Sequence, residues 1–244
     1  MGEREVAVKV MKTWGTKLEP KQERELELMR GLECEYIVRL YGTSLVNGRM
    51  GLVMELLPMG SLESTMKKSV FTPELKMRYA KDMCVGMEYL HSQHIIHRDL
   101  KLANVLVVST DPNSSTAVCK ISDFGTAKEV DLSMSMSMTM TQTANMGTPL
   151  YMAPEVFDAK SKYSLAADVY SYGITLAGLW NQQEPYEGQG ITSMMQLMSA
   201  VKKGVRPSIR PDCPQPYIQL MSACWATDPH TRPTFKQIHE SVFQ

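Results

Sequence analysis

The sequence predicts an α+β protein with two unequal parts, a small β-rich part over residues 1–57 and a mostly helical part over residues 58–244. Three observations support this division. β-Branched runs and a hairpin turn signal are concentrated in the first quarter of the chain. The tripeptide Pro58-Met59-Gly60 then interrupts the pattern. Beyond residue 153 the apolar residues recur at helical spacing.

About three strands and one helix are expected in the smaller part. Residues 6–11 form a short β-branched run that predicts a strand. In residues 21–32, apolar side chains recur at helical spacing among charged ones, which predicts an amphipathic helix. Two apolar runs, residues 37–46 and 50–56, flank Asn47-Gly48, a dipeptide typical of a hairpin turn.

The larger part is expected to be mainly helical. Thr72 is a predicted N-cap, and Pro73 at the first helical position opens a helix that runs to about residue 91. Two short strands follow, separated by a loop rich in Ser, Thr, Asn and Asp. The strands are expected at residues 105–108 and 118–121, and further helices at residues 166–180, 193–203, 217–225 and 234–243.

Composition and charge exclude several classes of protein. Lys+Arg and Asp+Glu balance at 26 each, which argues against nucleic acid or an anionic membrane as the main partner. No apolar run reaches the roughly 20 residues of a membrane span. The five cysteines form no C-x-x-C pair, which disfavours zinc and redox sites and predicts reduced thiols in a cytoplasmic protein.

Three motifs in the larger part carry the chemistry. Residues 97–104 read His-Arg-Asp-Leu-Lys-Leu-Ala-Asn, residues 123–125 read Asp-Phe-Gly and residues 153–155 read Ala-Pro-Glu. Each alone is weak, because a few charged residues in a loop are usually solvated surface. Their joint occurrence in this order, with Asn104 five residues after Asp99, is specific. On these residues the chain resembles the eukaryotic protein kinase family.

The resemblance implies a bilobal fold and transfer of phosphate from ATP to a protein hydroxyl. Asp99 is then expected to accept a hydrogen bond from the substrate hydroxyl, and Lys101 to contact the γ-phosphate. Asn104 and Asp123 are expected to bind Mg²⁺, a hard ion that prefers oxygen donors. Lys101 further implies Ser/Thr acceptors. The implied cofactors are ATP and Mg²⁺.

The resemblance also assigns a lysine to the nucleotide phosphates. Lys9, in the sequence Val-Ala-Val-Lys, is similar to the strand lysine that binds the α- and β-phosphates in the family. A glutamate on the following helix is expected to hold this lysine. Glu25 fits best, and Glu23 and Glu27 in the same run compete for the role.

Resemblance implies an adenine pocket as well. Met54 is similar to the residue that precedes the hinge, and adenine is expected to bind backbone groups of Glu55 and Leu57. Ala7 and Leu106 are expected to lie on either face of its ring. For each of these side chains, plain core packing is the alternative interpretation.

Several further residues match positions that have a structural role in the family. Met29, Leu40, Phe124 and His97 match its regulatory spine, with Asp168 as the anchor.

Thr148 matches the threonine that bonds the catalytic Asp and Lys. Glu155 is expected to form a buried ion pair with Arg232. Cys224-Trp225, together with Lys101, implies the tyrosine-kinase-like group of Ser/Thr kinases.

Regulation is expected between residues 125 and 147. The tract from Ser133 to Thr143 alternates Ser, Thr and Met, which predicts a mobile loop that an upstream kinase or the protein itself phosphorylates. Arg98 is the arginine that receives such a phosphate in the family. The alternative interpretation is that this tract is a flexible loop without a regulatory role.

The family's glycine-rich loop, which covers the ATP phosphates, is not found before residues 6–11, where only Gly2 precedes. The leading hypothesis is a protein Ser/Thr kinase domain in signal transduction, incomplete at its N-terminus. The alternative is a catalytically weak pseudokinase that acts as a scaffold. A small-molecule phosphotransferase is disfavoured by the peptide-binding segment at residues 147–155.

Overall fold

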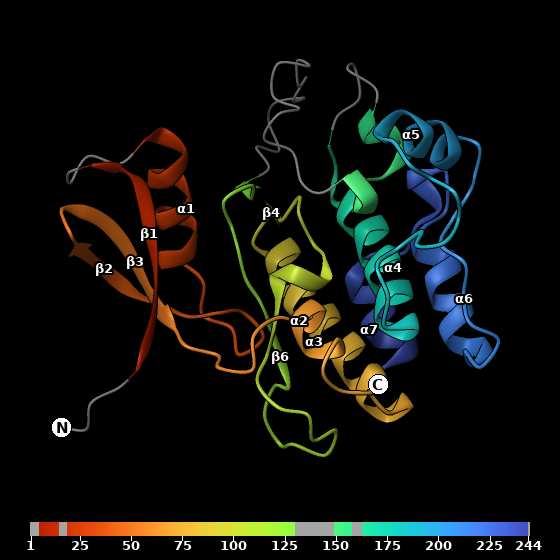
Figure 1. Cartoon of the computed structure of the whole chain (residues 1–244), viewed down its shortest axis with the longest axis horizontal. Coiled ribbons are helices and arrows are strands. Elements are labelled where there is room, and N and C mark those ends of the chain that lie inside the picture. Colours follow the sequence, from red (N-terminus) through yellow and green to blue (C-terminus); the bar gives the residue numbers. More distant parts are fainter. Residues whose placement is uncertain (1–4, 15–18, 130–148, 158–162, 244) are drawn as a thin grey trace.

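The computed structural model describes residues 5–14, 19–129, 149–157 and 163–243. They form a small lobe, with one sheet and one helix, beside a larger helical lobe (Figure 1). Residues 31–39 and residues 56–61 connect the two lobes. The domain boundary predicted after residue 57 lies within the second connection. The tract from Ser133 to Thr143 and Thr148 lie outside the described residues.

The small lobe contains a three-stranded antiparallel sheet in the order β1-β3-β2. Its strands are β1 (Val6–Trp14), β2 (Leu40–Val46) and β3 (Arg49–Glu55). The turn between β2 and β3 contains Asn47 and Gly48, whose φ angles of 48° and 76° match the hairpin turn that this dipeptide favours. The expected three strands are therefore confirmed.

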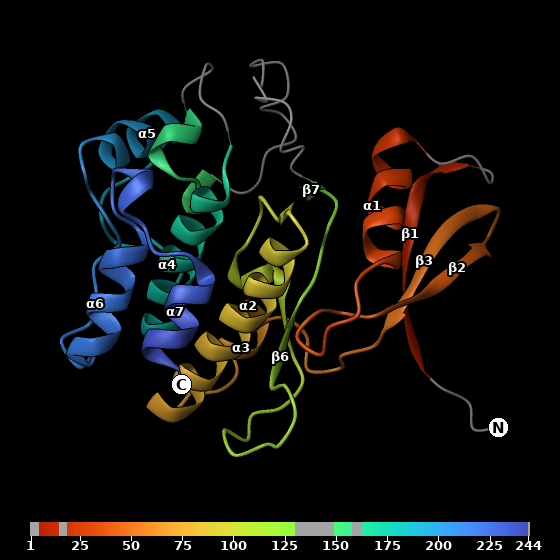
Figure 2. The ribbon, with the colours of Figure 1, turned by 180° about the vertical axis from the view of Figure 1, so that it is seen from behind.

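Helix α1 (Pro20–Arg30) lies along the sheet, between it and the helical lobe (Figure 2). Pro20 occupies the first turn, and Glu19 and Gln22 form a capping box that satisfies free backbone N–H groups. Leu26 and Met29 are buried on one face, as the amphipathic pattern predicts.

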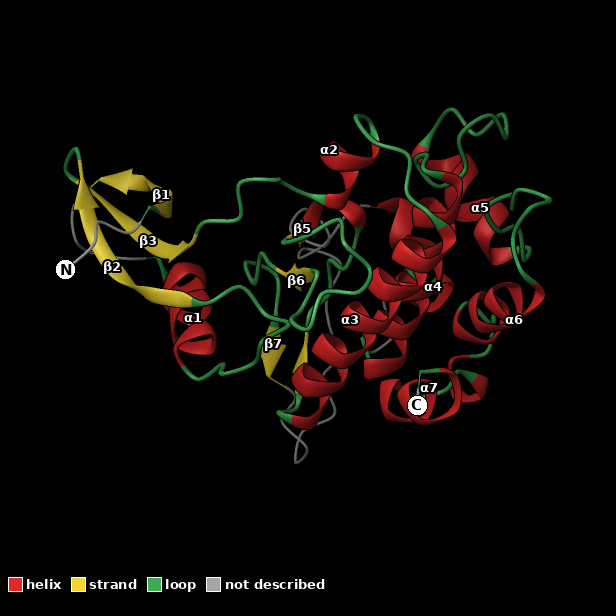
Figure 3. Cartoon of the chain, turned by 90° about the horizontal axis from the view of Figure 1, so that it is seen from below, coloured by secondary structure: helices red, strands yellow, loops and turns green. Residues whose placement is uncertain are grey.

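The helical lobe is built around α4, most of whose residues are buried. Helix α3 packs against α7, and α4 packs against α6. Figure 3 shows these helices gathered on the side away from the sheet. The helices of this lobe are α2 (Leu62–Met66), α3 (Pro73–Ser92), α4 (Leu165–Asn181), α5 (Met194–Lys202), α6 (Gln215–Cys224) and α7 (Phe235–Val242).

Two small antiparallel sheets of two strands each belong to the helical lobe. One pairs β5 (Val105–Val107) with β6 (Cys119–Ile121), and the other pairs β4 (Ile95–Ile96) with β7 (Lys128–Glu129). Of these strands, β5, β6 and β7 lie where this lobe faces the small lobe (Figure 3). The strands of the two sheets carry the loops that bear the predicted catalytic residues.

One expected strand begins later than the apolar pattern predicts. Residues 37–46 were expected to be extended throughout, but β2 begins at Leu40. The preceding residues bind β6 instead: the Val38 N–H donates to the Ile121 carbonyl at 2.9 Å, and the Ile121 N–H donates to the Tyr36 carbonyl at 2.9 Å. Ile37 therefore joins the core shared by both lobes, a tertiary contact that local sequence does not report.

No helix among the residues given above is long and apolar enough to cross a membrane.

Candidate active site

Lys9 is held by two carboxylates from different parts of the chain. Its ammonium lies 2.6 Å from Glu25 Oε1 on α1 and 3.0 Å from Asp123 Oδ1 in the Asp-Phe-Gly segment. Glu25 is only 6% exposed, whereas Glu23 and Glu27 face solvent. The structure therefore places Glu25, and neither neighbour, against Lys9.

These contacts shift the acid–base equilibria of the pair. Burial lowers the pKa of Lys9, but the Asp123 and Glu25 carboxylates outweigh burial, so the pKa lies above the ordinary value. Burial raises the pKa of Asp123, but the Lys9 ammonium and the Gly125 N–H outweigh it, so that pKa lies below the ordinary value. Both groups are consequently charged at neutral pH.

The loop after β4 gathers Asp99, Lys101 and Asn104. The Lys101 ammonium lies 2.8 Å from Asp99 Oδ2, and the Asn104 amide donates to the same oxygen at 3.0 Å and to the Asp99 carbonyl at 2.8 Å. A short 3₁₀ turn, η1 (Leu102–Asn104), makes these contacts possible by folding Asn104 back toward Asp99. Asp99 is 9% exposed, so its carboxylate has a fixed orientation within a largely desolvated site.

Asn104 and Asp123 fit the donor set that Mg²⁺ prefers. The Asn104 amide nitrogen is used by Asp99, which leaves its carbonyl oxygen as the group that can bind a cation. Asp123 is 47% exposed and has a φ of 62°, a left-handed conformation that a non-glycine residue adopts only under constraint. The described residues contain no group of three or more His, Cys, Asp or Glu suited to a metal. Mg²⁺ needs few protein ligands, because it keeps waters and substrate phosphates as its other ligands, and the oxygens of Asn104 and Asp123 match the donors it prefers.

Asp168 on α4 anchors the catalytic loop. Its fully buried carboxylate accepts the His97 N–H at 2.8 Å and the Arg98 N–H at 2.9 Å, and lies 3.0 Å from His91 Nε2. These contacts hold Arg98 at a φ of 70° immediately before Asp99. The sequence analysis missed His91, because no local pattern shows that α3 and α4 bring it against Asp168.

His97 and Phe124 are in direct contact, as the spine resemblance predicts. Their rings pack edge-on with centroids 5.4 Å apart, and His97 Nε2 lies 3.0 Å from the Ser122 carbonyl. Met29 is buried in the same hydrophobic core, and Leu40 packs against it partly buried. The regulatory role of this column stays a prediction.

The adenine-binding roles also stay predictions, although the structure places several of the residues near one another. Ala7 and Met54 are partners across the β1–β3 ladder. Leu106 on β5 pairs with Ser61, close after the hinge. The hinge begins at Glu55, whose carboxylate binds Lys120 on β6, a residue that the sequence analysis did not select.

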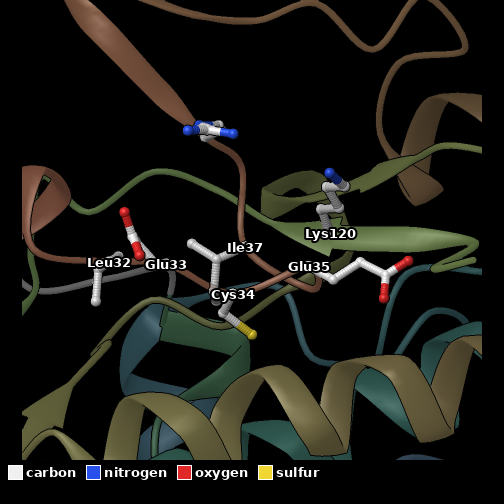
Figure 4. Close-up of a pocket in the computed structure, with 7 residues that line it drawn as sticks. Leu32, Glu33, Cys34, Glu35, Ile37 and Lys120 are labelled. Carbon is white, nitrogen blue, oxygen red and sulfur yellow. The ribbon is translucent and has the colours of Figure 1, made fainter.

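A cavity of about 320 Å³ lies between β6 and the segment that follows α1 (Figure 4). Lys120 from β6 and the segment after α1 form its lining, and the Cys34 side chain extends toward α3 in this view. The lining residues are Leu32, Glu33, Cys34, Glu35, Ile37, Arg39 and Lys120.

The predicted ion pair between Glu155 and Arg232 is confirmed. Arg232 Nη1 and Nη2 lie 2.7 and 2.8 Å from the two carboxylate oxygens, a bidentate geometry, and the Arg232 side chain is fully buried. Arg232 also donates to the Ala226 and Ala166 carbonyls. The pair therefore fastens the Ala-Pro-Glu segment to the last helices.

Protein kinases share this architecture: a small β lobe pairs a strand lysine with a helix glutamate, and a helical lobe opposite it carries a loop aspartate. The chain belongs to this family: the family model for protein tyrosine and serine/threonine kinases matches residues 1–242.

The relatives are Ser/Thr kinases of the tyrosine-kinase-like type, as predicted. Serine/threonine-protein kinase STY46 of Arabidopsis thaliana is 35% identical over 98% of this chain. Human receptor-interacting serine/threonine-protein kinase 1 is 34% identical over 88%, and bovine mitogen-activated protein kinase kinase kinase 7 is 35% identical over 88%. The matches span 40%, 33% and 35% of the length of these relatives, respectively. The expected lack of a glycine-rich loop stays a prediction.

Proposed function

We propose that the protein transfers the γ-phosphate of ATP to Ser or Thr hydroxyls of other proteins. The observation that carries the proposal is the fixed Asp99 carboxylate, bound by Lys101 and Asn104, in the lobe that faces the Lys9–Glu25 pair. Phosphoryl transfer depends on positioning and on neutralising charge, and this site supplies both.

Each residue has a distinct task in this mechanism. Asp99 accepts a hydrogen bond from the substrate hydroxyl, which orients the oxygen for attack, and receives the proton as the bond to phosphorus forms. Lys101 places positive charge near the transferred phosphoryl group, and Lys9 neutralises the phosphates that stay behind. Mg²⁺ held by Asn104 and Asp123 supplies further charge neutralisation when it is bound.

The chain carries every charged group that the reaction requires, which favours catalysis over the scaffold alternative. Lys101 and the names of the relatives favour Ser/Thr acceptors. We place the activity in cytoplasmic signalling, where the five free thiols remain reduced. Phosphorylation of the tract from Ser133 to Thr143, by an upstream kinase or by the protein itself, is its proposed regulation.

Incorporation of labelled phosphate into a generic Ser/Thr protein substrate tests the proposal. Wild-type protein is expected to transfer phosphate with Mg²⁺ and ATP, and Asp99→Asn is expected to lose about 10²-fold or more of the rate. Equal ATP binding and equal melting temperature in the variant would show that folding and nucleotide binding are intact. Transfer that is equally absent from both proteins would support the scaffold alternative instead.

A further inference from the structure

A second ion pair joins the two lobes, between the start of the hinge and β6. Lys120 Nζ on β6 lies 2.8 Å from Glu55 Oε1 and 2.9 Å from Glu55 Oε2. The two side chains are only 15% and 22% exposed, so water screens this pair less than a surface pair. Glu55 is the last residue of β3, where the small lobe ends and the hinge begins.

Glu55 is held at its backbone as well as at its side chain. Its N–H donates to the Arg39 carbonyl at 2.9 Å, and its Oε2 accepts the Arg39 N–H at 3.3 Å. The segment that contains Arg39 is itself bound to β6 through Val38 and Ile121. The carboxylate of Glu55 therefore completes a closed set of contacts among β3, β6 and the segment that precedes β2.

Removing Lys120 would leave the Glu55 carboxylate partly desolvated beside one backbone N–H. A carboxylate that loses its counter-ion at such a site rotates toward water, because desolvation without compensation is unfavourable. Rotation of this side chain would release the Arg39 N–H and loosen the peptide groups that follow Glu55. Those peptide groups are the ones that we expect to bind adenine.

From this geometry we infer that Lys120 is a positioning residue for the nucleotide, which acts through Glu55 to fix the hinge backbone. The inference rests on the proposed function, because it concerns how adenine is bound at the same site. Lys120 is not a catalytic residue, since its ammonium is committed to Glu55 at the rear of the hinge. It sets nucleotide affinity and leaves the transfer step to Asp99 and Lys101.

The cavity that Lys120 lines makes the inference testable. Lys120 borders this space of about 320 Å³ (Figure 4), so an unbranched methionine fits there without overpacking the core. We therefore expect Lys120→Met to fold. Lys236→Met is the matched control, because Lys236 forms a looser pair, 3.9 Å from Glu240, on the exposed face of α7.

The experiment measures Mg·ATP binding by calorimetry, melting temperature and phosphate transfer for five variants of the full chain. They are Lys120→Met, Glu55→Gln, the double variant, Lys120→Arg and Lys236→Met. The dissociation constant of Mg·ATP is expected to rise about tenfold in Lys120→Met, with KM for ATP following it and kcat within about twofold of wild type. The double variant is expected to bind no more weakly than Lys120→Met, because the two residues act as one unit. Lys120→Arg is expected to restore binding, and Lys236→Met to bind as wild type does.

Unchanged ATP affinity in Lys120→Met, or a fall in kcat with KM unchanged, would overturn the inference. Additive effects of the two single substitutions, or a wild-type chain that binds no adenine nucleotide, would overturn it as well. Binding is measured without turnover, so the outcomes for the two proposals separate. A chain that transfers no phosphate but shows the affinity loss would refute the proposed function and support this inference.

Discussion

Lys9 of β1 and Asp123 of the Asp-Phe-Gly segment lie 3.0 Å apart across the two lobes, although 114 residues separate them in sequence. Glu25 binds the same ammonium at 2.6 Å, so the positive charge of Lys9 on β1 holds both α1 and the Asp-Phe-Gly segment. The orientation of the small lobe is therefore linked to the position of the expected Mg²⁺ ligand.

Lys9→Met is expected to raise the pKa of the Asp123 carboxyl from its depressed value in the wild-type protein. Burial raises that pKa, whereas the Lys9 ammonium and the Gly125 N–H lower it, so removing the ammonium takes away the largest effect that opposes burial. Because the folded-state pKa is depressed in wild type, this carboxyl stabilises the fold above pH 3.8 and loses that effect as the pH falls through the folded value. NMR titration of the side-chain carbon checks the shift, with Glu23→Gln as the control. An unchanged Asp123 pKa in Lys9→Met would contradict the assignment.

Asp168→Ala is expected to lower the free energy of unfolding by about 3 kcal/mol and to abolish transfer. The substitution leaves the buried His97 and Arg98 N–H groups without their acceptor, and each such loss costs about 1–3 kcal/mol. It also removes the contacts that hold Arg98 in its left-handed conformation before Asp99. Urea unfolding measures the loss, and Asp111→Ala in an exposed loop is the control. Equal stability of the two variants would argue against the anchor.

Motif spacing was sufficient to select the charged residues that the structure brings into two clusters, because phosphoryl transfer, the expected reaction, requires particular residue types in a fixed order. Lys9 and Glu25 form the contact that the resemblance implied. Asp99, Lys101 and Asn104 lie together in one loop, although their mutual contacts were not predicted. Element types in both lobes also followed from local pattern, since helical and strand periods differ.

Residues that support the site were harder to predict. His91 and Lys120 act on Asp168 and Glu55, which are 77 and 65 residues away in sequence. Such contacts depend on how helices and strands pack, and no local period encodes them. The late start of β2 has the same origin, since Val38 hydrogen-bonds to β6 in place of continuing that strand.

Arg232→Lys is expected to destabilise the fold by about 3 kcal/mol, because a partly buried carboxylate loses its bidentate partner and two carbonyls lose their donors. Arg210→Lys is the matched control. Arg210 and Asp212 are each 55% exposed, and such surface pairs contribute about 0–1 kcal/mol. Chemical denaturation of both variants compares the two sites. A loss in Arg232→Lys no larger than in the control would show that the buried pair is not structural.

Gly86 on α3 permits the close approach of the segment that precedes β2. A Cβ at this position would lie 2.9 Å from Ile121 Cδ1 and 3.1 Å from the Tyr36 carbonyl oxygen, which is itself bound to the Ile121 N–H. Alanine would otherwise favour the helix by about 1 kcal/mol. Overpacking costs about 1–3 kcal/mol, and the nearest polar atom belongs to backbone, which cannot move aside without breaking its hydrogen bond.

Gly86→Ala is therefore expected to lower the free energy of unfolding by up to about 2 kcal/mol, despite the gain in helix propensity. It is also expected to weaken ATP binding, because displacement of Ile121 moves β6 and with it Lys120 and Asp123. Gly31→Ala provides the control, since its Cβ would meet only the Leu28 carbonyl at 3.9 Å and the glycine has an ordinary helical φ of −86°. Denaturant unfolding and ATP titration compare the two variants. A stabilised Gly86→Ala protein with normal ATP affinity would show that this contact between α3 and the Tyr36–Val38 segment does not position the site.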